Sequence, residues 1–108
     1  MTRRRILPMP LNFPFTRYNP PETSGPDQIG VYELGWPAPT FSGYAVVYIG
    51  SGQVSSRLRN HWRGDKTWCV YRCEITNSTR RARERERREQ RRFKNQKERL
   101  PKFNLRIG

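Results

Sequence analysis

The sequence predicts an α/β domain in which a small three-stranded antiparallel sheet is flanked by helices and preceded by an extended proline-rich arm. Three short segments are rich in β-branched and aromatic residues, two others have helical spacing, and the prolines concentrate near the amino terminus. With 108 residues, the chain has room for one domain. We therefore expect an arm over residues 1–28 and a domain over residues 29–108.

The expected arm, residues 1–28, contains six of the nine prolines of the chain. Proline lacks a backbone donor and breaks helices, so a helix is excluded there. Apolar side chains stand between the prolines, which indicates that the arm packs on the domain, on a second subunit or along a ligand. A partly ordered terminus is the alternative.

Three segments are typical of strands. Residues 29–34 and 44–50 are short runs of β-branched and aromatic residues, and residues 67–75 alternate between two faces. Glycine and proline in residues 35–43 predict a loop, so the first two strands should form a hairpin.

Residues 54–62 have the spacing of a helix, because Leu58 and Trp62 recur four apart. Arg57 and His61 repeat this spacing on an adjoining face. Gly64 is expected to end this helix.

A second helix is predicted from about residue 79 to about residue 99, with Asn77, Ser78 or Thr79 as its cap and Pro101 after it. One stripe of this helix consists of Ala82, Glu86, Glu89, Phe93, Gln96 and Leu100. Two carboxylates thus stand on the face that should meet the core. Such groups need a cation, a metal ion or hydrogen bonds, and pairing with neighbouring arginines is the simplest interpretation.

The formal net charge of +13 points to a polyanionic partner. Residues 80–108 contain 13 Lys and Arg against 4 Glu, so most of the excess lies in the second helix and the segment after it. Nucleic acid is the first partner to consider.

No run of apolar residues is long enough to span a membrane, and prolines interrupt any export signal at the amino terminus. Cys69 and Cys73 lie too far apart along an extended strand to form a disulfide with each other. These features predict a cytoplasmic protein without a structural disulfide or a membrane partner.

Several motifs occur in a characteristic order along residues 29–105. They are Gly30-Val31-Tyr32 in the first expected strand, Tyr48-Ile49-Gly50 ending the second, Arg57 and His61 on the first helix, and Pro101-Lys102-Phe103-Asn104 near the end. In this order they resemble the GIY-YIG nuclease domain. The resemblance implies a metal-dependent DNA endonuclease that hydrolyses phosphodiester bonds.

The resemblance also implies catalytic roles. Tyr32 would act as general base or orient the attacking water, and Tyr48 would hydrogen-bond the scissile phosphate or the water. Arg57, with Arg59 as the alternative, would stabilise the developing negative charge. His61 would assist Tyr32 or bind phosphate.

One divalent cation is implied, Mg²⁺ with Mn²⁺ as a substitute, and Glu89 is the expected catalytic carboxylate and metal ligand. Glu86 is the alternative ligand. Gly30, Gly50 and Asn104 are expected to support the active site.

The basic residues of the second helix are the expected DNA platform: Arg80, Arg81, Arg83, Arg87, Arg88, Arg91 and Lys94. The substrate would be DNA, with branched and single-stranded forms included. A single site cuts one strand, so cleavage of both strands predicts a homodimer on DNA.

Two other functions remain open. The basic helix could belong to a non-catalytic DNA- or RNA-binding module in which the tyrosines only pack. A small ribosome-associated or RNA-processing protein also fits the composition, although the order of the motifs disfavours it.

Overall fold

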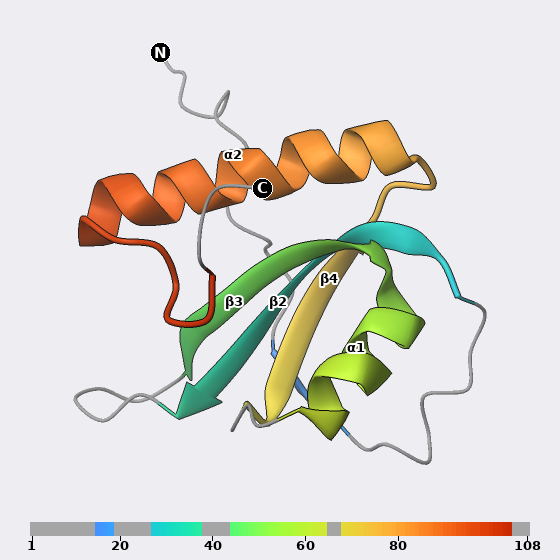
Figure 1. Cartoon of the computed structure of the whole chain (residues 1–108), viewed down its shortest axis with the longest axis horizontal. Coiled ribbons are helices and arrows are strands. Elements are labelled where there is room, and N and C mark those ends of the chain that lie inside the picture. The colour runs from blue at the N-terminus through green and yellow to red at the C-terminus, as the bar shows by residue number, and fades with distance from the viewer. Residues whose placement is uncertain (1–14, 19–26, 38–43, 65–67, 105–108) are drawn as a thin grey trace.

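Two long paired strands and two helices form the frame of the molecule (Figure 1). The structure is a computed structural model that describes residues 15–18, 27–37, 44–64 and 68–104. Its elements are β1 (Thr16–Arg17), β2 (Ile29–Pro37), β3 (Tyr44–Gln53), α1 (Val54–Arg63), β4 (Val70–Ile75) and α2 (Thr79–Lys97). The chain is therefore α/β, as predicted, and both expected helices are present.

Within the described ranges, the sheet has four antiparallel strands in the order β1-β4-β2-β3, one more than the three predicted. The additional strand is β1, which belongs to the expected arm and pairs Thr16 with Tyr71 of β4. A strand of two residues has no periodicity of its own, so the sequence pattern could not predict it. Most of the arm, residues 1–14 and 19–26, lies outside the described residues.

The expected hairpin is formed by β2 and β3, which pair over their whole length with an irregularity between Leu34 and Gly35. Both strands are longer than predicted, since β2 continues to Pro37 and β3 to Gln53. Most of the predicted loop, residues 38–43, lies outside the described residues.

The two faces of the sheet carry different helices (Figure 1). Because side chains alternate along a strand, Tyr32 and Leu34 pack with Leu58 of α1, whereas Val31 on the other face packs towards Phe93 of α2. The core is small and is built partly from aromatic rings.

The helix ends are stabilised by polar groups. Ser78 caps α2 by accepting a hydrogen bond from the Arg81 backbone, in agreement with the predicted position of the cap. At the start of α1 the cap comes from outside the helix, because the Asp27 carboxylate accepts from the Ser55 backbone. None of the helices described is long and apolar enough to cross a membrane.

Candidate active site

Three of the predicted catalytic side chains meet on the α1 side of the sheet. Tyr32 of β2 lies opposite Gly50 of β3, and Tyr48 precedes Gly50 by two residues on the same strand. The Tyr32 hydroxyl lies 2.7 Å from His61 Nε2, within hydrogen-bonding distance. The ring centroids of Tyr48 and His61 are 4.6 Å apart. These contacts join two strands and one helix.

Gly50 makes room for this arrangement. A Cβ atom at residue 50 would lie 2.6 Å from the Tyr32 hydroxyl oxygen and 2.7 Å from Cε2 of Tyr48, closer than side-chain carbons approach. The missing side chain therefore allows both phenol rings to lie against the β3 backbone. Gly30, the other expected supporting glycine, packs instead against the backbone of β4 at Glu74.

Arg57 stands near the same tyrosines, and its side chain is exposed. Gly52 has a φ of 136°, which favours glycine, and a Cβ atom there would lie 2.8 Å from Arg57 Nε. The guanidinium acts to lower the pKa of both Tyr32 and Tyr48. Arg59, the alternative, is hydrogen bonded to Ser56.

The phenols of Tyr32 and Tyr48 are nevertheless harder to ionise than a free tyrosine. Burial is the largest cause that raises the pKa of Tyr32 above its usual 10.0, followed by the neighbouring Tyr48. Burial and then the charge of Glu86 raise the pKa of Tyr48. Both side chains are therefore protonated in the free protein at neutral pH.

Glu86 is the carboxylate of α2 that belongs to this site. Its Oε1 accepts a hydrogen bond from the Ser51 hydroxyl, and its Oε2 accepts one from Gln90 Nε2 at 3.0 Å. Ser51 directly follows the Tyr48-Ile49-Gly50 motif, so these bonds hold the carboxylate at the end of β3. Its charge also raises the pKa of Tyr32 and Tyr48.

Glu89, the carboxylate favoured on sequence grounds, lies among other partners. Its side chain is 2% exposed and forms an ion pair with Arg85. Glu33, on the α2 side of β2, interacts with Glu89 and is paired with Arg72 at 2.7 Å. Tyr32 and Glu33 are successive residues of one strand, so their side chains face opposite sides of the sheet. Glu89 interacts with Glu33 and therefore lies on the side of the sheet opposite to Tyr32.

Asn104 lies beside the motif of β3. Its Oδ1 accepts from the Ile49 backbone nitrogen, and its Nδ2 donates to the Ile49 carbonyl, both at 2.9 Å. The side chain of Gln90 donates to the same carbonyl. Because β3 is an edge strand, these side chains supply hydrogen bonds that a further strand would otherwise make.

A depression of about 430 Å³ opens beside the end of β3. Polar and cationic side chains line it, among them Ser51, Arg57, Asn60 and Arg83. It therefore brings one arginine from each helix to the same depression, where a phosphate could be bound.

Most of the predicted DNA platform is available to a partner. Arg80, Arg81, Arg83, Arg88, Arg91 and Lys94 are exposed, and Arg87 is half-buried. Arg80 pairs with Glu84 on the helix surface at 3.4 Å, a pair that is too exposed to hold the arginine firmly.

Ser51 and Gln90 were not identified from the sequence. The spacing of Glu86 and Gln90, four apart on a helix, is a signal that could have indicated their contact. The role of Ser51 depends on where α2 crosses β3, for which the sequence contains no local signal. Comparison with protein-family models, curated proteins and solved structures finds no match for this chain.

Proposed function

We propose that this chain is a metal-dependent DNA endonuclease of the GIY-YIG type. The observation that carries the proposal is the group of Tyr32, Tyr48 and His61, with the charges of Arg57 and Glu86 acting on the same phenols. A packing role for the two tyrosines alone would require neither an adjacent imidazole nor a fixed carboxylate.

Glu86 is the residue proposed to hold the divalent cation. The described residues contain no group of three or more His, Cys, Asp and Glu side chains suited to a metal ion. Mg²⁺ often binds through one or two carboxylates and keeps waters and substrate phosphate oxygens as its other ligands, so a single oriented carboxylate fits it. The bound ion would neutralise charge on the phosphate and favour ionisation of water.

Tyr32 and His61 provide a route for the proton of the attacking water. With Nε2 of His61 unprotonated, the Tyr32 hydroxyl donates to it across 2.7 Å. As water attacks phosphorus, Tyr32 accepts a proton from the water while its own proton passes to His61. This relay avoids a free tyrosinate, which burial disfavours.

Arg57 and Tyr48 act on the phosphate. The exposed guanidinium of Arg57 can donate two hydrogen bonds to non-bridging oxygens, whose negative charge grows in the transition state. The half-buried Tyr48 hydroxyl donates to the phosphate or to the water. The bond from phosphorus to the departing 3′ oxygen then breaks, and that oxygen takes a proton from solvent.

The test is cleavage of supercoiled plasmid and of branched DNA by the purified protein with Mg²⁺ or Mn²⁺. Glu86→Gln should reduce the rate at least about 100-fold, because it removes the charge that holds the ion. Glu84→Gln changes an exposed carboxylate of the same helix and should leave the rate unchanged. Binding measured in EDTA should be similar for all these proteins.

Three outcomes would contradict parts of this proposal. Loss of cleavage in Glu89→Gln but not in Glu86→Gln would show that Glu89, and not Glu86, holds the metal ion. Cleavage that continues in EDTA would contradict the proposed metal dependence. Salt-dependent binding without cleavage of any substrate would favour the non-catalytic DNA- or RNA-binding module.

A further inference from the structure

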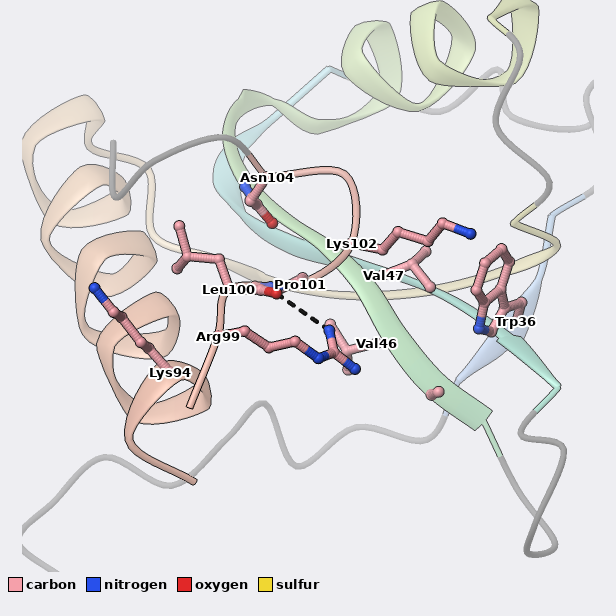
Figure 2. A pocket seen from close by; sticks show the side chains of 10 residues that line it. Trp36, Val46, Val47, Lys94, Arg99, Leu100, Pro101, Lys102 and Asn104 are labelled. Atoms are coloured by element: carbon pink, nitrogen blue, oxygen red, sulfur yellow. Dashed lines mark hydrogen bonds between the residues drawn. The ribbon is translucent and has the colours of Figure 1, made fainter. Parts of the chain in front are cut away.

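We propose that a groove beside the start of β3 binds an unpaired DNA strand and leads it to the candidate active site. The groove has a volume of about 630 Å³ and lies between β3 and the segment that follows α2 (Figure 2). The residues used here are Trp36, Val46, Lys94, Arg99, Lys102 and Asn104, and we call the site the C-terminal groove. This inference rests on the proposed function in taking DNA as the ligand.

The charge of the C-terminal groove favours phosphate. Three of its described lining residues, Lys94, Arg99 and Lys102, are cationic, and none is acidic. In Figure 2 the Arg99 side chain reaches towards Val46, and its Nη1 donates to the Leu100 carbonyl at 3.3 Å. Arg99 and Lys102 are exposed, so their remaining donors can bind a strand that enters the groove.

Trp36 provides an aromatic surface at one end of the groove. Its ring is half-buried, and Lys102 Nζ lies 4.8 Å from the ring centroid. Figure 2 shows the two side chains next to each other. A base that stacks on Trp36 would bring its phosphate close to Lys102, and this pairing of aromatic and cationic groups is typical of single-strand binding sites.

Asn104 links the groove to the strand that carries part of the candidate active site. This residue lines the groove, and its side chain bonds to Ile49, which lies between Tyr48 and Gly50. A strand that continues along β3 beyond Asn104 would therefore reach the proposed catalytic residues.

The size of the groove favours an unpaired strand over a duplex. Its volume lies in the range of small-ligand pockets, about 300–1,000 Å³, which accept individual bases and phosphates. A duplex keeps its bases stacked inside and cannot offer one to Trp36. Duplex DNA has another surface available in the exposed arginines of α2.

The test measures fluorescence anisotropy of labelled oligothymidylate and of a blunt duplex of the same length, in EDTA so that cleavage cannot occur. Lys102→Ala and Arg99→Ala should each reduce affinity for oligothymidylate about fivefold at ~0.1 M salt. Each contact to a single-strand phosphate adds about 0.7 to the slope of log affinity against log salt concentration, and at this salt concentration the loss of one contact corresponds to about fivefold. Affinity for the duplex should change less than twofold. Trp36→Leu should weaken binding of the single strand by at least about fivefold.

Arg63→Ala is the matched control, since it removes an exposed cation at the end of α1, outside the groove. Equal losses for single strand and duplex would overturn the proposal, as would wild-type affinity in Lys102→Ala and Arg99→Ala. Labelled oligouridylate is measured in the same way, and variants that lose affinity for it but not for oligothymidylate would overturn the assignment to DNA. If the protein cleaves no substrate but the variants show the expected losses of affinity, the proposed nuclease activity is wrong and the proposed single-strand site stands. If the protein is an active nuclease and the variants show no such losses, only the proposed single-strand site is wrong.

Discussion

At the residue scale, the site depends on a glycine, because residue 50 has no room for a side chain. Gly50 lies under the rings of Tyr32 and Tyr48, and the space that a methyl group would take is already filled by these rings. The need for glycine there comes from close approach, not from an unusual backbone angle. The tripeptide motif therefore has a steric reason for its glycine.

Gly50→Ala should displace the phenols and reduce both stability and activity. Overpacking of this kind costs about 1–3 kcal/mol in the free energy of unfolding. Urea unfolding and plasmid cleavage measure the two effects. Gly64→Ala is the control, because a Cβ atom there would lie 3.5 Å from the His61 carbonyl, an ordinary contact. Equal stability of the two variants would contradict the steric explanation.

At the element scale, the edge strand β3 is held by hydrogen bonds from the segment that follows α2. Asn104 bonds both backbone groups of Ile49, and the Phe103 backbone nitrogen donates to the Val47 carbonyl at 2.9 Å. The segment after α2 thus replaces a neighbouring strand beside the motif that contains Tyr48. The position of α2 is linked to this arrangement through Gln90.

Asn104→Ala should destabilise the protein by about 1–3 kcal/mol, because it leaves the buried backbone of Ile49 without a partner for its nitrogen. Amide hydrogen exchange of Ile49 should accelerate more than that of the other buried amides of the sheet, because a general loss of stability would accelerate all of them alike. Asn95→Ala, at an exposed position of α2, is the control. Unchanged exchange at Ile49 would contradict the proposed role of the bond.

At the scale of the whole molecule, a cluster of buried charges between α2 and the sheet links stability to pH. Glu33 and Glu89 are each 2% exposed and face Arg72 and Arg85, with Glu74 paired to Arg85 at 3.3 Å. Burial is the largest cause that raises the pKa of Glu33 to about 7, and Glu89 adds to it against the opposing effect of Arg72.

The sign of the pH effect follows from the raised pKa. Between the usual value of 4.5 and about 7, the folded protein binds more protons at Glu33 than the unfolded chain does. The contribution of Glu33 to the free energy of unfolding is therefore present below pH 4.5 and is lost as pH rises to about 7, with a slope of at most about 1.4 kcal/mol per pH unit. Glu33→Gln should remove this contribution.

Urea unfolding across this pH range, for wild type, Glu33→Gln and the exposed control Glu84→Gln, measures the effect. Glutamine keeps an oxygen that can accept from Arg72, so the variant should fold. A Glu33→Gln profile parallel to that of the wild type would show that Glu33 does not titrate in this window.

Local patterns were sufficient for much of this fold. The apolar spacing of Leu58 and Trp62, the β-branched run before Gly50 and the polar cap at Ser78 each depend on neighbours in the sequence, and the elements they predicted are present. The association of Tyr32, Tyr48 and His61 was expected only from the resemblance to the GIY-YIG nuclease domain, and the structure brings these three side chains together.

Long-range packing decided the rest. Glu86 and Glu89 occupy the same predicted stripe, and only the crossing of α2 over β3 places Glu86 at Ser51 and Glu89 beside Glu33 and Arg85. The fourth strand, β1, likewise exists only through its pairing with β4. Helical spacing specifies which side chains share a face, but it contains no information about what that face meets, because those contacts join residues far apart in the sequence.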